Sequence, residues 1–146
     1  YLVGAVILAA LRNRGFPVTS SMVDEAIARA KRVPLGSCGL WGACGAAIGA
    51  GVGFSVALRV DMMSGEKRAQ ALRLVAGVLE EISRLGGPRC CKASVALAIM
   101  AARRLLNEKH GVGFDESTLF RCPFAMKNPD CLKEGCPFYA GRGESS

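Results

Sequence analysis

The feature that most constrains the fold is an uncharged stretch from Leu40 to Leu58, in which glycine recurs at every fourth position. These glycines are Gly45, Gly49 and Gly53. A helix that is apolar on all sides must be buried, either by other protein elements or by lipid. We therefore expect a helix over about residues 43–60 at the centre of the molecule, where its glycines let a neighbouring backbone approach closely.

A membrane-spanning helix is the alternative interpretation of this stretch. Its length is sufficient to cross a bilayer, and small residues at every fourth position form packing faces in membrane helices. However, glycine lowers its hydrophobicity, and amphipathic helices elsewhere in the chain can cover it. Burial within the protein is favoured over a membrane location, and an interaction or membrane module built on the three glycines is kept as a rival.

The rest of the first 111 residues divides into four amphipathic helices. Apolar residues at helical spacing predict them over about residues 2–11, 21–33, 64–86 and 90–109, the last ended by Gly111. Ser21 with Asp24 predicts a capping box, and Ser64 predicts a further helix start. The inward-facing residues expected on the last two helices are Leu72, Val75, Leu79 and Ile82, followed by Val95, Ile99, Ala102 and Leu106.

Residues 112–146 lack this periodicity and predict an irregular tail. Asn128 and Pro129 indicate the start of a short turn that Gly135 ends. No segment has the alternation of a strand. We therefore predict an all-α fold, a single domain over 1–146, in which a five-helix bundle (1–111) surrounds the central Gly/Ala-rich helix and a cysteine-bearing tail packs on it.

The seven cysteines limit the chemistry of the chain. An odd number cannot all pair, and a chain of 146 residues can bury a core without disulfides. Unpaired thiols at this density are typical of a reducing compartment, so we expect a cytoplasmic location. The sequence begins at Tyr1 rather than Met, so we expect a fragment or a processed piece of a longer chain.

The first cysteine group lies in a glycine-rich turn that leads into the central helix. Cys44 falls on the first helical turn, where free N–H groups and the helix dipole stabilise a thiolate, and Cys38 precedes it in the loop. Glycines let the main chain wrap around an anionic centre, and the candidate cofactor-binding positions are Gly36, Gly39, Gly42 and Gly45. The alternative is a plain turn with two buried cysteines.

The second group, Cys90 and Cys91, opens the last helix. The two side chains lie about 100° apart around the helix axis, so only one can easily face a given site. We prefer Cys90, although both stay candidates. Basic residues on either side, Arg89 and Lys92, favour the thiolate form.

The third group lies in the tail, where a Cys-Pro-Phe unit occurs twice. The third group consists of Cys122, Cys131 and Cys136, and two basic residues, Arg121 and Lys133, lie near them in the sequence. Proline after cysteine turns the chain away from a ligated sulfur and removes one backbone donor. A polar tail has little core of its own, so metal ligation would order it. A disulfide between two of the three is the alternative.

Together these groups predict a metal centre, most simply a [4Fe-4S] cluster used in electron transfer or structure. The candidate ligands are Cys38, Cys44, Cys90, Cys91, Cys122, Cys131 and Cys136. Zinc is the alternative, but structural zinc sites favour close cysteine pairs, and only Cys131 with Cys136 approaches that spacing. The one histidine, His110, ends the last helix, where a capping role is favoured over ligation.

Other functions find less support. The net charge of +7 comes from scattered Lys and Arg residues, so nucleic-acid binding is not expected. No Ser-His-Asp set, phosphate-binding loop or helix-borne carboxylate pair is present, so enzymatic activity stays undecided. The main rival is a thiol redox or sulfur-relay protein in which Cys44, Cys90 or Cys91 is the nucleophile. A protein partner or a homodimer is also open.

The string from Gly36 to Gly53 resembles the family known as domain of unknown function 5714, and the resemblance extends to Pro34 and the Cys136-Pro137-Phe138 unit of the tail. More loosely, Cys44-Gly45-Ala46-Ala47-Ile48-Gly49 is similar to a Cys-Gly-Ala-x-x-Gly signature of short proteins regarded as redox-active. The resemblance implies an accessory module of anaerobic archaea and bacteria, found at times beside methyltransferase or radical-enzyme domains.

Overall fold

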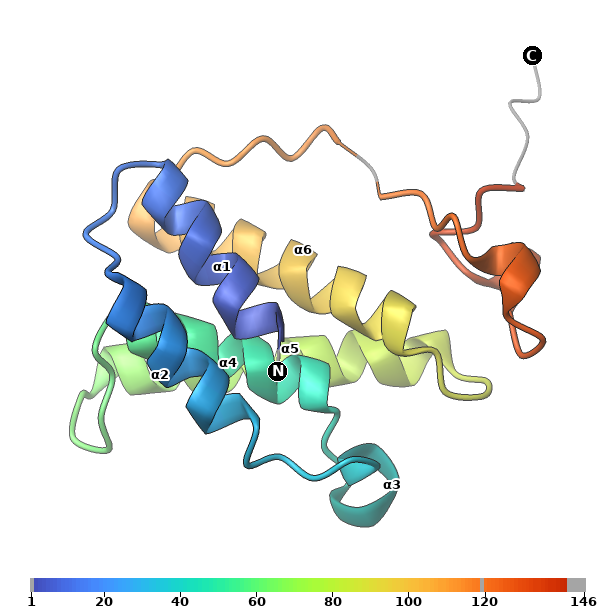
Figure 1. The fold of residues 1–146 in the computed structure, drawn as a ribbon, viewed down its shortest axis with the longest axis horizontal. Helices are drawn as coiled ribbons and strands as arrows, with labels where there is room; N and C mark the ends of the chain where they lie inside the picture. Colours follow the sequence, from blue (N-terminus) through green and yellow to red (C-terminus); the bar gives the residue numbers. More distant parts are fainter. Residues whose placement is uncertain (1, 119, 142–146) are drawn as a thin grey trace.

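Helices account for most of the chain in the computed structural model, which describes residues 2–118 and 120–141 (Figure 1). They are α1 (Leu2–Asn13), α2 (Ser20–Ala30), α3 (Ser37–Trp41), α4 (Gly45–Ala57), α5 (Glu66–Leu85) and α6 (Cys91–His110), followed by the 3-10 turns η1 (Ala125–Lys127) and η2 (Lys133–Gly135). The described residues contain no strand, so the all-α prediction is confirmed. Residues 142–146 of the predicted tail lie outside the described part.

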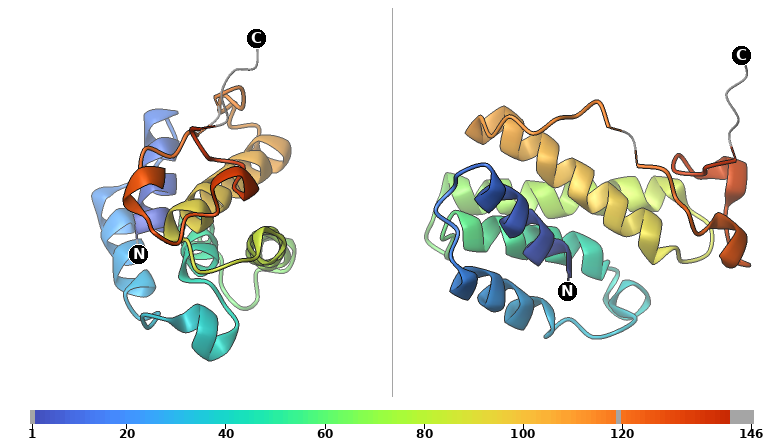
Figure 2. Two further views of the ribbon diagram at one scale, coloured as in Figure 1. Left: turned by 90° about the vertical axis from the view of Figure 1, so that its right-hand side faces the viewer. Right: turned by 45° about the horizontal axis from the view of Figure 1, so that its top comes forward.

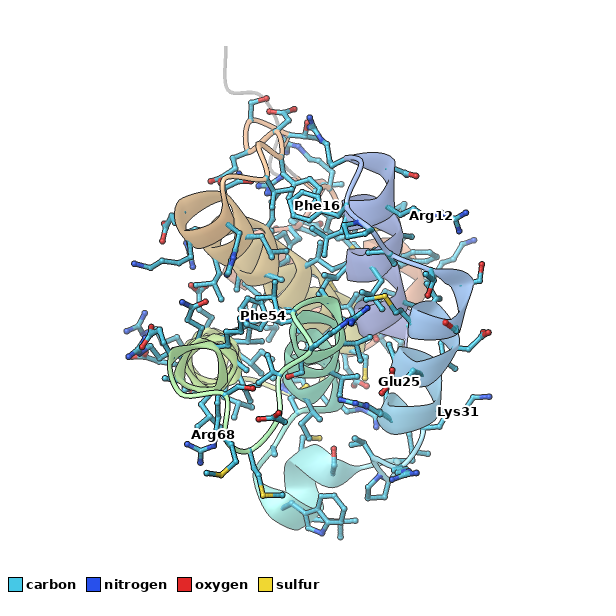
Figure 3. All side chains as sticks on the ribbon, turned by 90° about the vertical axis from the view of Figure 1, so that its left-hand side faces the viewer. Arg12, Phe16, Glu25, Lys31, Phe54 and Arg68 are labelled. Atoms are coloured by element: carbon cyan, nitrogen blue, oxygen red, sulfur yellow. The ribbon has the colours of Figure 1, made fainter. Side chains whose placement is uncertain are left out.

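The central position predicted for the Gly/Ala-rich helix is confirmed. Helix α4 packs against α1, α2, α5 and α6, and its Ala47, Ala50 and Phe54 are fully buried. Figure 3 shows Phe54 in the interior and the charged side chains of Arg12 and Lys31 at the periphery. Within the described residues, no helix has the length and apolar character needed to cross a membrane.

Helices α1 and α4 meet backbone to backbone at three glycines. A β-carbon on Gly53 would lie 2.8 Å from the Cα of Gly4, and one on Gly4 would lie 3.0 Å from the carbonyl oxygen of Gly49. Real β-carbons essentially never approach this closely, so the helices would have to separate. Gly45 does not share in this contact, because its nearest neighbour there would be 3.8 Å away.

Two side chains predicted to face inward are exposed instead. Leu72 is 54% exposed and Val95 is 37% exposed. On α5 the buried face passes through Ala71, Leu74 and Val78, which turns Leu72 toward solvent. Val95 lies on the side of α6 that faces away from the other helices and toward the segment after Gly111. The apolar residues of α5 and α6 therefore extend beyond the faces that other parts of the protein cover.

Two helix starts differ from their predictions. The cap of α2 is Thr19, whose hydroxyl accepts a hydrogen bond from the N–H of Met22 at 3.3 Å, while Ser21 is already helical. The N-cap of α5 is Gly65. The hydroxyl of Ser64 instead donates to a carboxylate oxygen of Asp61, at 2.8 Å.

The predicted glycine-rich turn contains the five-residue helix α3. Gly36 and Gly42 flank it with φ of 83° and 66°. This left-handed conformation favours glycine because it has no β-carbon. Cys38 thus lies in a short helix rather than in a loop, and α3 sits at the lower edge of the molecule in Figure 1.

The tail returns to the N-terminal half of α6 and builds a second, smaller core there (Figure 2). Its buried members are Ala93, Ala96, Leu97, Cys136 and Phe138. The backbone N–H of Cys122 donates to the carbonyl of Phe138 at 2.8 Å, which closes the tail on itself. The turn predicted to begin at Asn128 is present, because the N–H of Cys131 donates to the carbonyl of Asn128 at 3.1 Å and the N–H of Asp130 donates to its side-chain oxygen at 3.3 Å. Gly135 then ends η2, as expected.

His110 has a different role from the predicted helix cap. Its Nε2 lies 3.0 Å from the side-chain oxygen of Gln70, and its ring packs edge-on against Phe54. Gly111 ends α6 in the left-handed conformation, as expected. Burial lowers the pKa of His110, and the nearby Lys67 lowers it further. The charged form suited to a helix C-terminus is therefore disfavoured.

The glycine contact predicts opposite effects for two alanine substitutions. We expect Gly53→Ala to destabilise the fold by about 1–2 kcal/mol, because overpacking against Gly4 outweighs the better helix propensity of alanine. The matched control is Gly77→Ala in α5, where nothing lies within 4 Å of the added carbon. It should stabilise by about 0.5–1 kcal/mol. Urea denaturation measures both, and a Gly53→Ala variant as stable as the wild type would contradict the contact.

The lowered pKa of His110 predicts a pH dependence of stability. The unfolded chain, with a histidine pKa near 6.5, binds a proton more readily than the folded state. The stabilisation is therefore complete well above about pH 6.5 and is lost as the pH falls from there through the lower pKa of the folded state. Since His110 is the one histidine of the sequence, His110→Gln should flatten the slope of unfolding free energy between about pH 7.5 and about pH 5.5. Equal slopes would refute the assignment.

Candidate metal centre

Four of the seven cysteines border one small cavity between the start of α6 and the tail. They are Cys90, Cys122, Cys131 and Cys136, and the cavity has a volume of about 20 Å³. In the left panel of Figure 2 the tail lies over the end of the bundle that carries this cavity. None of the four cysteines forms a disulfide.

Cys90 is positioned by the start of α6. It occupies the N-cap position in an extended conformation, and its carbonyl accepts hydrogen bonds from the N–H and the hydroxyl of Ser94, at 3.1 and 3.2 Å. Cys91 begins the helix itself and is exposed. This agrees with the expectation that only one of the adjacent pair faces a given site.

Backbone hydrogen bonds within the tail fix the positions of Cys122 and Cys136. The N–H of Cys136 donates to the carbonyl of Lys133 at 2.8 Å, directly after η2. The bridge between Cys122 and Tyr139 then brings the two Cys-Pro-Phe units side by side. Phe138 is buried against α6 at 4% exposure, so it anchors both cysteines to the helix.

Cys131 receives a hydrogen bond at its sulfur. The backbone N–H of Lys133 points to the Sγ of Cys131 at 3.4 Å, while the N–H of Cys131 itself donates to the carbonyl of Asn128 at 3.1 Å. Hydrogen bonds to cysteine sulfurs are a feature of iron-sulfur sites. Cys131 is thus held in an arrangement suited to a ligand.

The tail packs against the turn between α5 and α6. Gly87 has a φ of 67°, and a β-carbon on it would overlap the side chain of Leu132. Leu132 lines the cavity and is the residue after Cys131. Nothing in the sequence marked Leu132, whereas the repeated Cys-Pro-Phe unit indicated that the tail carries part of the site.

The electrostatic environment of the cavity is cationic. Lys92 lines it, and its ammonium group lies 5.0 Å from the centre of the Phe124 ring. Among the described residues, the cavity lining contains no aspartate or glutamate. One positive charge and no carboxylate favour thiolates and an anionic guest over a hard cation such as Mg²⁺.

The donor set fits a sulfur-ligated metal, but the sulfurs do not converge on a single point. In the part of the chain that the structure describes, no three His, Cys, Asp or Glu side chains are arranged to hold one ion. Tetrahedral zinc requires each Zn–S distance to be near 2.3 Å, which forces its sulfurs close together. The thiols in the described residues therefore do not form a tetrahedral zinc site.

The first cysteine group lies elsewhere. Cys38 is exposed on α3, and Cys44 occupies the N-cap position of α4, where it packs partly buried against the main core. Neither lines the cysteine cavity, and none of the candidate glycines does, namely Gly36, Gly39, Gly42 and Gly45. Figures 1 and 2 both show α3 apart from the tail.

Comparison with known families then places the chain. A model described as a family of unknown function, DUF5714, matches residues 1–139. The chain belongs to this family. The match spans every helix and all seven cysteines, so the resemblance noted in the sequence is confirmed. No match is found among curated proteins or among solved structures. Membership of DUF5714 thus identifies the family of the chain but assigns it no activity.

The geometry predicts an order of thiol alkylation. In reduced protein treated with a chelator, the exposed Cys38 and Cys91 should react roughly 10-fold or more faster than the buried Cys136, which needs local opening to react. Peptide mass spectrometry after timed iodoacetamide treatment measures this order. In urea all seven should react at similar rates. Equal rates for Cys91 and Cys136 in the native protein would show that the tail does not pack as described.

Proposed function

We propose that this chain is a metal-binding domain in which Cys90, Cys122, Cys131 and Cys136 ligate a [4Fe-4S] cluster. The observation that carries the proposal is the single cavity bordered by these four thiols. Three come from the tail and one from the start of α6, so ligation would tie the tail to the bundle. The cluster would supply one-electron transfer or a structural crosslink.

A metal is favoured over a disulfide because of the number of thiols at the cavity and because of the groups that surround them. Four thiols at one cavity match the ligand count of both cluster and zinc sites, whereas a disulfide uses two. The backbone N–H of Lys133 points to the sulfur of Cys131, and Lys92 brings a positive charge to the same lining. Hydrogen bonds to sulfur also tune the reduction potential of iron-sulfur clusters.

The cluster is proposed over zinc because structural zinc sites favour close cysteine pairs, whereas only Cys131 and Cys136 approach that spacing here. The cavity of about 20 Å³ is little larger than the 10–15 Å³ that a water requires, so a cluster would need the tail to move outward. The tail is held by a small core, which makes such movement inexpensive.

The cavity lining suits a group that must be kept from water. Phe124 and Phe138 come from the two Cys-Pro-Phe units, and Leu132 covers the side near Gly87. Apolar shells of this kind control solvent access to metal centres and so influence their redox potentials. A partner that exchanges electrons with the centre, either another protein or a second copy of the chain, is part of the same proposal.

Adjacent cysteines provide a matched test of the ligand set. Cys90→Ser should lower metal affinity by at least about 100-fold, because changes even beyond the ligands cost 10–100-fold. Cys91→Ser should keep the wild-type metal content, since Cys91 points away from the cavity. Iron, acid-labile sulfide and zinc are measured on each protein after anaerobic purification, together with the visible absorption spectrum.

The outcomes separate the alternatives. Iron and sulfide in equal amounts, lost in Cys90→Ser and Cys131→Ser, support the cluster. Zinc that is bound by the wild type and lost in the same two variants would support the same ligands, with zinc in place of the cluster. Folded protein without iron or zinc, even after reconstitution, would refute the metal centre and favour a thiol redox protein. Equal losses in Cys91→Ser or Cys38→Ser would refute the ligand set.

A further inference from the structure

A second cavity, with a volume of about 190 Å³, runs along α6 beside the cysteine cavity. One wall is a stripe of α6 residues at helical spacing, and the other is the segment that leads from α6 to the tail. The stripe consists of Lys92, Val95, Ala96, Ile99, Met100 and Arg103, and the segment contributes Thr118 and Phe120. With a rise of 1.5 Å per residue, the stripe is ~16 Å long.

The segment over this groove is fixed near Arg103. The two terminal nitrogens of Arg103 donate to the carbonyls of Asp115 and Glu116, at 2.8 and 3.3 Å. One turn further on, the side chain of Asn107 both accepts from the N–H and donates to the carbonyl of Phe114, each at 2.8 Å. These bonds hold residues 114–116 against α6 at one end of the groove.

A local turn also stiffens the segment. The Asp115 carboxylate accepts hydrogen bonds from the N–H and hydroxyl of Ser117 and from the hydroxyl of Thr118, at 2.8, 2.7 and 2.9 Å. These bonds lower the pKa of Asp115 to about 2, so the carboxylate stays ionised at neutral pH and is already saturated with donors. The charge of the nearby Arg103 lowers this pKa further, so Asp115 balances part of the charge at this end of the groove.

The lining combines an apolar middle with cationic ends. Val95, Ile99 and Phe120 supply the apolar surface, while Lys92 and Arg103 stand at opposite ends of the stripe. The lining residues that the structure describes include no acid. The Nε of Arg103 is buried and has no hydrogen-bond partner among the described residues. Since this Nε has no accessible surface, a ligand in the groove would meet the guanidinium through the remaining N–H groups of its two terminal nitrogens, each of which donates one bond to the segment.

We infer that this groove binds a short aliphatic monocarboxylate. An apolar cavity of ~150 Å³ accommodates benzene, so 190 Å³ has room for a chain of about six to nine non-hydrogen atoms. The alkyl chain would lie along Val95, Ile99 and Phe120, and the carboxylate would lie at the Arg103 end. A charge-assisted hydrogen bond from arginine is the interaction that selects a carboxylate over a neutral group.

The two cavities share a wall. Lys92 and Phe120 line both, so a ligand in the groove lies next to the proposed metal centre. Binding itself does not depend on a metal. A role for the carboxylate as a substrate or effector of the centre would rest on the proposed function.

The test uses 4-methylpentanoate as the probe and 4-methylpentanamide as its neutral match. Binding to the full chain, as purified anaerobically, is followed by ligand-observed NMR and by titration calorimetry. We expect a Kd on the order of 1 mM for the carboxylate, as is usual for a ligand of this size. The amide should bind at least about 10-fold more weakly, because it lacks the charge that Arg103 recognises.

Two neighbouring arginines give the matched variants. Arg103→Gln should weaken carboxylate binding at least about 10-fold and leave amide binding nearly unchanged, while Arg104→Gln, which removes the same charge outside the groove, should stay within about two-fold of wild type. Because Arg103→Gln could also loosen the segment, Val95→Trp is added. It keeps both cations, starts from a partly exposed position, and should abolish binding of both probes by filling the groove.

Three results would each show that the groove is not a carboxylate site. No binding at concentrations on the order of 10 mM, equal affinities for acid and amide, or equal losses in Arg103→Gln and Arg104→Gln would each refute the carboxylate site. Circular dichroism confirms that each variant is folded. Metal content is measured on the same samples, so failure of the groove and failure of the metal centre are scored separately.

Discussion

Direct backbone contact between α1 and α4 is the constraint on which the arrangement of the other helices depends. Gly4, Gly49 and Gly53 bring the two helices close together, and a β-carbon on Gly53 would lie only 2.8 Å from the Cα of Gly4. With α1 so close, α4 can be surrounded on its remaining sides by α2, α5 and α6. The position of α6 matters most for function, because its N-terminal half is the platform for the tail, the cysteine cavity and the adjoining groove.

The tail depends on far less apolar contact than the bundle does. The smaller core joins Cys136 and Phe138 to α6, and Leu132 fits against Gly87. A segment with so few buried contacts opens at low free energy unless something else holds it. Ligation of three tail cysteines together with Cys90 would add binding free energy at the place where packing is sparse, since metal binding and ordering share one free-energy balance.

Local patterns predicted the helices better than they predicted the site. The central helix and the end of α6 at Gly111 both follow from chemistry within a few residues. Leu72 and Val95 were misplaced because apolar periodicity does not reveal which side of a helix is covered. The meeting of Cys90 with the tail joins residues some thirty or more positions apart in the sequence, and spacing alone could not separate that pairing from one with Cys38 or Cys44.

The shared wall makes the two cavities dependent on each other. The segment above the groove is tied to Arg103 at one end and continues directly into Cys122 at the other, with Phe120 between them. A group larger than the 20 Å³ cavity must displace the tail, and Phe120 would move with it. Any ligand of the groove that prefers one position of Phe120 therefore alters the affinity of the cysteine site, and linkage requires the reverse effect to be equal. Lys92, which lines both cavities, adds an electrostatic route for the same coupling.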